Sequence, residues 1–163
     1  MEPGGTNSNG APRELPRGRY AARLDDKGRL KLPADFVQFF HKLPESKMFL
    51  TSLDRRIASL YPIDEWRTNE KFLDDFQADP GAAYNIAFNA NDLGADVEMD
   101  GQGRVTVHPD LRRELKMEGS ELHLISYKGH VEIMTDELYQ EQKRAATANT
   151  AADLTVLKKA GLR

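Results

Sequence analysis

The sequence contains no cysteine, so neither a disulfide nor a thiolate metal site can hold this chain together. It also lacks any apolar run long enough to cross a bilayer, and its first residues, MEPGGTNSNGAPRELPRGR, lack the apolar segment of a signal peptide. We therefore expect a cytoplasmic protein without membrane contact. Its 163 residues can form one core or two small fused ones, but not a large enzyme of several domains.

The chain also has no excess of positive charge, and its formal net charge is -3 at pH 7. This value argues against a uniformly basic nucleic-acid binder, but the charges are unevenly distributed. Basic residues dominate segments 13–31 and 143–163, whereas acidic residues dominate segment 64–79. The location of the charges therefore tells us more than their sum.

Signatures of catalysis and of metal binding are absent as well. The chain has no GxSxG motif, and the acidic pair Asp74 and Asp75 is typical of a solvated helix face. Segment 101–104, GQGR, begins like a dinucleotide fingerprint, but Thr106 stands where the third glycine belongs. The histidines lack the paired spacing of zinc sites: His41, His108, His123 and His130. We predict no enzyme, no small-molecule substrate, no cofactor and no metal.

The sequence does contain one short motif that occurs twice. DDKGRLKLP, residues 25–33, returns 75 residues later as DGQGRVTVHP, residues 100–109. Each copy has an aspartate, a glycine and an arginine ahead of an alternating apolar run. The match continues beyond the motif, where Leu111 corresponds to Phe36 and Leu115 to Phe40. A repeat of this size indicates an internal duplication, whose units usually pack around a pseudo-two-fold axis.

The first copy predicts a β-hairpin followed by a helix. Segments 19–24 and 29–32 alternate with the period of two that is typical of strands. Segment 26–28 is a three-residue connection, in which Gly28 takes the positive φ of a G1 bulge. Pro33 can begin a helix, and apolar residues follow it at helical spacing: Phe36, Phe39, Phe40 and Leu43.

Each half then continues in the same way. A strand pair, 48–62 or 121–135, leads to a helix that starts at IDEW or DELY. We divide the chain into a disordered tail (1–17), a first repeat (18–78), a connecting segment (79–94), a second repeat (95–141) and a C-terminal tail or short helix (142–163). Composition alone favours a solvated surface charge for Arg29. A turn, however, does not need a long cationic side chain at the residue that follows it.

The stretches DDKGRLKLPADF, LYPIDEW and VEMDGQGRVTVHPDLR closely resemble the MraZ family of bacterial transcriptional regulators. The resemblance extends from about residue 18 to residue 139. It implies an α+β fold, a tandem duplicated swapped-hairpin β-barrel related to AbrB with flanking helices. It also implies a ring-like homo-oligomer, associated with the nucleoid, that binds direct repeats of double-stranded DNA upstream of its own division and cell-wall gene cluster.

The same resemblance assigns the DNA contacts to the DxxxR motifs, Asp25 with Arg29 and Asp100 with Arg104. Arginines on a hairpin edge can neutralise phosphates or pair with guanine, and aspartates can orient them. Other basic residues of the first hairpin extend the predicted DNA-binding set: Arg23, Lys27 and Lys31.

The chain departs from the family at several positions. Val37 stands where the family usually has an arginine, and segment 82–84 (AAY) replaces an arginine pair. Gln102 stands where the first copy has Lys27, and segment 96–116 carries more acids than bases. We therefore expect the first hairpin to supply more DNA affinity than the second. The alternative function is an oligomeric swapped-hairpin interaction module, similar to an antitoxin, that binds a protein partner.

Overall fold

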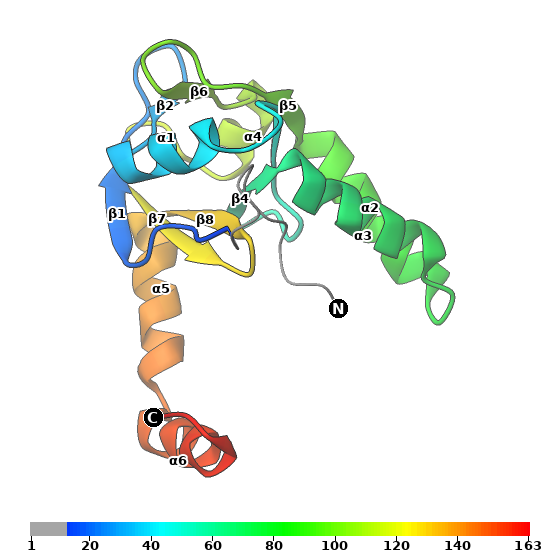
Figure 1. Cartoon of the computed structure of the whole chain (residues 1–163), viewed down its shortest axis with the longest axis vertical. Helices are drawn as coiled ribbons and strands as arrows, with labels where there is room; N and C mark the ends of the chain where they lie inside the picture. Colours follow the sequence, from blue (N-terminus) through cyan, green and yellow to red (C-terminus); the bar gives the residue numbers. More distant parts are fainter. Residues whose placement is uncertain (1–12) are drawn as a thin grey trace.

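The computed structural model describes residues 13–163 and has an α+β architecture (Figure 1). A six-stranded antiparallel sheet has the order β1-β7-β8-β4-β3-β5, and a two-stranded sheet joins β2 to β6. The strands are β1 (Arg19–Ala22), β2 (Arg29–Lys31), β3 (Met48–Thr51), β4 (Ala58–Pro62), β5 (Ala95–Val97), β6 (Arg104–Thr106), β7 (Leu122–Tyr127) and β8 (His130–Thr135). The helices are α1 (Ala34–His41), α2 (Ile63–Asp75), α3 (Pro80–Leu93), α4 (Pro109–Glu114), α5 (Asp136–Thr147) and α6 (Thr150–Ala160).

The first strands of each repeat pair with strands of the other repeat, whereas β3 with β4 and β7 with β8 pair within one repeat. β1 pairs with β7, β5 pairs with β3, and β2 pairs with β6, all antiparallel. The predicted hairpin between segments 19–24 and 29–32 is therefore wrong in its pairing, since only one isolated bridge joins Leu24 to Leu30. Alternation in the sequence determines which face of a strand is buried, but it does not determine the neighbouring strand.

One hydrophobic core lies between the two repeats. Leu30 and Val105 have no exposed surface, and each packs in the same cluster as helix residues Phe36 and Leu111. Burying one such side chain contributes about 1.5–3 kcal/mol. A smaller cluster, including Phe49, Tyr61 and Trp66, packs where α2 and α3 meet the sheet. The α+β class is confirmed, and the swapped-hairpin barrel stays a prediction.

The predicted helices and strand pairs form largely where the sequence places them. α1 begins directly after Pro33, and α4 begins at Pro109. β3 and β4 occupy segment 48–62, and β7 and β8 occupy segment 121–135. α5 is capped by Thr135, whose hydroxyl accepts a hydrogen bond of 3.3 Å from the backbone N–H of Leu138. These elements hold the two turns in place.

One segment contains a helix that the sequence analysis does not predict. The connecting segment 79–94 contains α3, which Asp79 caps by accepting a 3.0 Å hydrogen bond from the N–H of Ala82. α2 and α3 project from the body side by side, and α5 and α6 extend from the body in another direction (Figure 1). Neither α5 nor α6 contains a buried residue. The domain boundaries stay predictions.

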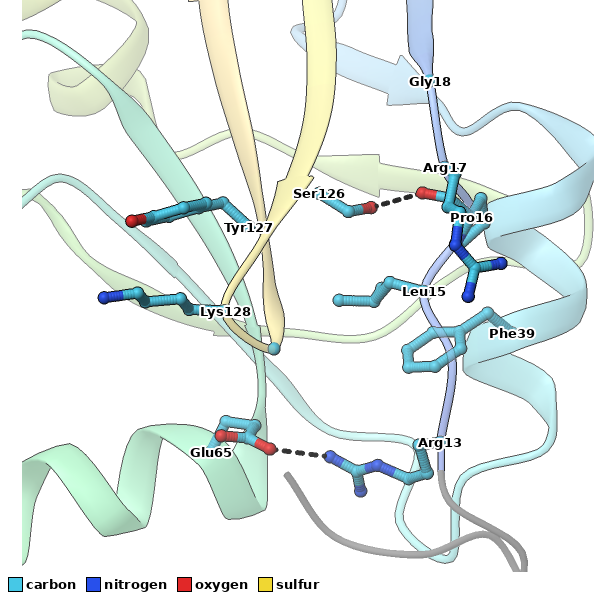
Figure 2. Close-up of a pocket in the computed structure, with 11 residues that line it drawn as sticks. Arg13, Leu15, Pro16, Arg17, Gly18, Phe39, Glu65, Ser126, Tyr127 and Lys128 are labelled. Atoms are coloured by element: carbon cyan, nitrogen blue, oxygen red, sulfur yellow. Dashed lines mark hydrogen bonds and ion pairs between the residues drawn. The ribbon is translucent and has the colours of Figure 1, made fainter. Parts of the chain in front are cut away.

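Part of the segment that we expected to be a disordered tail packs on the body. Residues 1–12 lie outside the described residues, but Arg13, Leu15 and Pro16 contact the body. Arg13 forms ion pairs with Asp64 at 2.6 Å and Glu65 at 3.3 Å, and its side chain is only 5% exposed. Ser126 donates a 2.8 Å hydrogen bond to the carbonyl oxygen of Pro16 (Figure 2). These specific contacts could not be predicted from the overall composition of the segment.

Within residues 13–163, each helix is too short or too polar to cross a membrane.

Candidate nucleic-acid interface

The two DxxxR turns lie at opposite ends of the short antiparallel ladder between β2 and β6, because each turn comes directly before one of these two strands. Gly28 accepts a 2.9 Å hydrogen bond from the N–H of Val107, and Gly103 accepts one of 3.0 Å from the N–H of Leu32. Each turn is thus fixed to the strand of the other repeat. The structure brings the motifs together although 75 residues separate them in the sequence.

Asp25 both closes the first turn and holds Arg29. One carboxylate oxygen accepts hydrogen bonds from the backbone N–H groups of Lys27 (3.0 Å) and Arg29 (2.9 Å). The other oxygen accepts a 2.7 Å hydrogen bond from Nε of Arg29. Gly28 has a φ of 76°, as the connection requires. Asp25 therefore orients the guanidinium as well as the backbone.

The second turn repeats this geometry almost atom for atom. Asp100 accepts from the N–H groups of Gln102 (2.9 Å) and Arg104 (3.0 Å), and from Nε of Arg104 at 2.7 Å. Gly103 has a φ of 74°. Because the same three hydrogen bonds recur, the DxxxR spacing is the sequence signature of one structural unit that occurs twice.

Hydrogen bonding also lowers the pKa of the two aspartates. The backbone N–H of Arg104 is the main cause that lowers the pKa of Asp100 to about 2. The backbone N–H of Arg29 likewise lowers the pKa of Asp25. Both carboxylates therefore stay ionised to a more acidic pH than an ordinary aspartate does.

The arginines retain binding capacity. Each uses Nε for its aspartate, and the terminal nitrogens of both make no hydrogen bond within residues 13–163. The side chains of Arg29 and Arg104 are 27% and 23% exposed. A guanidinium held in this way can still donate two hydrogen bonds to a phosphate or to a guanine edge.

Each turn also receives a basic residue from the other repeat. Lys31 donates a 2.9 Å hydrogen bond from Nζ to the carbonyl oxygen of Gln102. Arg112 lies over Gly28 so closely that a Cβ atom there would overlap the guanidinium. It is fixed in place by 2.9 Å hydrogen bonds to the carbonyl oxygen of Val107 and to Glu118. Arg112 is thus a candidate site residue that we did not predict.

The duplication contains the signal that would have identified Arg112. At the same offset of 75 residues, Arg112 corresponds to Val37. Val37 packs over Gly103 as Arg112 packs over Gly28, with its Cγ2 2.8 Å from the position of a Cβ at Gly103. The arginine missing at Val37 is therefore present at the equivalent position of the second repeat.

The remaining predicted residues, Arg23 and Lys27, are exposed. Their side chains make no hydrogen bond or ion pair in the part of the chain that the structure describes. The first turn therefore carries Lys27, Arg29 and the packed Arg112, and Arg23 precedes it by two residues in the chain. The second gathers Arg104 and Lys31.

One cluster has the spacing of metal ligands: Glu121, His123 and Asp136. Buried His123 has Nδ1 3.0 Å from a guanidinium nitrogen of Arg19 and Nε2 2.8 Å from Asp136. Because a guanidinium only donates hydrogen bonds, Nδ1 is the acceptor and Nε2 carries the proton. Both ring nitrogens are thus engaged, and the arrangement is a polar link between β1, β7 and α5.

A cavity of about 380 Å³ lies between the N-terminal segment and the turn from β7 to β8 (Figure 2). Leu15, Phe39, Ser126 and Lys128 are among its lining residues. The residues that we predict to contact DNA do not line it. The candidate interface is therefore formed by the two turns and not by this cavity.

No family model matches the chain. Individual relatives, however, match it over most of its length. The chain is 34% identical to the transcriptional regulator MraZ of Acidobacterium capsulatum and 33% identical to that of Koribacter versatilis, in each case over 90% of the chain and 99% of the relative. It is 28% identical to the MraZ of Methylobacillus flagellatus, over 85% of the chain and 93% of the relative. The chain belongs to the MraZ family of transcriptional regulators.

Proposed function

We propose that the chain is a sequence-specific DNA-binding transcriptional regulator that acts as a ring-like homo-oligomer. Its targets are direct repeats of double-stranded DNA upstream of its own gene, in a division and cell-wall gene cluster. Its location is then the cytoplasm, in association with the nucleoid. The names of its relatives support regulation, and the DNA targets follow from the family resemblance.

The observation that carries this proposal is the duplicated Asp–Arg turn. Two arginines, Arg29 and Arg104, are oriented by identical sets of hydrogen bonds on neighbouring strands. A solvated surface charge needs no such fixation, whereas a reader of bases or phosphates gains from a preorganised guanidinium. The geometry therefore supports DNA contact by these arginines better than a role as solvated surface charges.

The low net charge of one chain is the reason why this proposal includes an oligomer. A chain of net charge -3 presents only two turns, so one copy can neutralise few phosphates. Several copies that align their turns on one DNA would bind with avidity, because each contact after the first is intramolecular. Direct repeats would supply equivalent sites for such copies.

The proposal is tested with labelled DNA from the region upstream of the gene and a shuffled duplex of equal length. We expect fluorescence anisotropy to give at least tenfold tighter binding to the upstream DNA, with affinity that falls as salt rises from 50 to 200 mM. Light scattering at micromolar concentration should give a mass above that of one chain. Equal, salt-independent binding of the two duplexes would instead favour the interaction module that binds a protein partner.

A further inference from the structure

The helical hairpin of α2 and α3 exposes aromatic side chains of a kind that soluble proteins usually bury. Phe72 is 61% exposed, and it packs with Phe76 at a ring distance of 5.4 Å. The two rings line a shallow groove on α2 together with Thr68, Lys71 and Asp75. Exposed apolar surface of this kind, with a polar rim, is typical of a protein interface.

α6 has the complementary property. Leu154, Leu157 and Lys158 follow the i, i+3, i+4 spacing of one helix face, and both leucines are exposed. The helix has 11 residues and buries none of them within the described part of the chain. A helix of this length is marginal in water on its own, so a partner surface would stabilise it.

The segments that contain the two surfaces carry opposite net charge. The acidic segment 64–79, which contains α2, has six carboxylates against Arg67 and Lys71, and two of them, Asp64 and Glu65, pair with Arg13. Of these two bases, Arg67 pairs with Glu45 and Lys71 with Asp75. The basic segment 143–163 has Asp153 as its single acid. Opposite regional charges steer association and fix the orientation of partners.

The two surfaces of one chain do not meet. α6 lies at the far end of α5, while α2 and α3 project from another side of the body (Figure 1). A second copy can satisfy both surfaces, because each chain carries one groove and one α6. Such an interface is head-to-tail, and its repetition closes into a ring when the rotation allows it.

We propose that α6 of one copy docks in the α2 groove of a second copy. Leu154 and Leu157 contact Phe72 and Phe76, and the basic segment 143–163 lies against the acidic segment 64–79. This interface rests on the homo-oligomer of the proposed function and identifies the surfaces that form it.

Three full-length variants test the interface. Phe72→Glu disables the groove, and Leu157→Glu disables α6. Val156→Glu is the matched control, because Val156 is 67% exposed and lies on the opposite face of the same helix. All three residues are exposed, so circular dichroism should show the parent fold in each variant.

Sedimentation velocity at micromolar concentration gives the readout. We expect the parent and Val156→Glu to have the same oligomeric mass, and Phe72→Glu and Leu157→Glu each to be a monomer. An equimolar mixture of the two defective variants should form a 1:1 dimer, because one intact groove then meets one intact α6. Their association in the mixture should be at least tenfold tighter than that of either variant alone.

Other outcomes overturn the interface. If either defective variant keeps the parent mass, or if the mixture stays monomeric, α6 does not dock in this groove. An oligomeric parent with these results would leave the proposed function intact. A parent that is itself monomeric would contradict the oligomer of the proposed function as well.

Discussion

Leu30 lies directly opposite Val105 in the ladder between β2 and β6, and each is the counterpart of the other in the duplicated sequence. The pseudo-two-fold axis therefore passes between them. Arg29 and Arg104 are their chain neighbours, opposite Thr106 and Lys31 respectively. This fully buried contact between the repeats thus also fixes the spacing of the two arginines.

Replacing Leu30 by Ala should therefore destabilise the protein and disturb both turns together. The cavity and the lost burial should cost about 2–5 kcal/mol, measured by urea unfolding. Val156→Ala, at an exposed site on α6, is the control and should change stability by less than about 0.5 kcal/mol. A Leu30→Ala protein as stable as this control would contradict a shared core at the axis.

The first turn should not tolerate a side chain at Gly28. Ala at this position would have to adopt a φ of 76° and displace Arg112, so we expect a loss of roughly 1–3 kcal/mol. Gly101→Ala is the matched control, because a Cβ atom at Gly101 would have no other atom within 4 Å. Thermal unfolding that shows equal stability for the two variants would contradict the requirement of the turn for a positive φ at Gly28.

Much of this turn could be predicted from the sequence, because its chemistry is local. The glycine, the flanking Asp25 and Arg29, and the helix after Pro33 depend on neighbouring residues. The pairing of β1 with β7 could not be predicted, because both available partners satisfy the same alternation. α3 was missed although Asp79 and Pro80 form a helix start, since small residues such as Ala82 and Ala83 weaken its apolar pattern.

Stability should depend on Asp100 in acid. Its folded pKa of about 2 is lower than its ordinary value of 3.8, so ionised Asp100 stabilises the fold above pH 4. That contribution is lost as the pH falls toward 2. The difference in Tm between the parent and Asp100→Asn should therefore narrow between pH 5 and pH 2.

Asp26→Asn is the control for this pH series. Asp26 is exposed and makes no side-chain hydrogen bond within residues 13–163, so we expect its Tm to follow the parent throughout. If the Tm difference between the parent and Asp100→Asn stays constant with pH, the charge of the Asp100 carboxylate does not stabilise the turn.

Arg112 should contribute to DNA binding through the first turn. Arg112→Ala removes the guanidinium that packs on Gly28, and we expect roughly fivefold weaker binding, equivalent to about 1 kcal/mol. Arg113→Ala removes the same charge from an exposed site on the same helix and should have a smaller effect. Anisotropy titrations at one salt concentration compare the two, and a larger loss for Arg113→Ala would contradict this role.

The most direct measurement is DNA binding by Arg29→Ala, Arg104→Ala and Asp25→Ala in anisotropy titrations across a salt series, with circular dichroism to confirm folding. Arg29→Ala should lose roughly 1–3 kcal/mol per subunit, and Arg104→Ala less, because the first turn gathers more basic residues. Asp25→Ala should also bind more weakly, although it removes a negative charge, because Arg29 loses its orienting partner. If Arg29→Ala binds as the parent does, or if Asp25→Ala binds more tightly with an unchanged salt dependence, the turns do not present arginines to DNA.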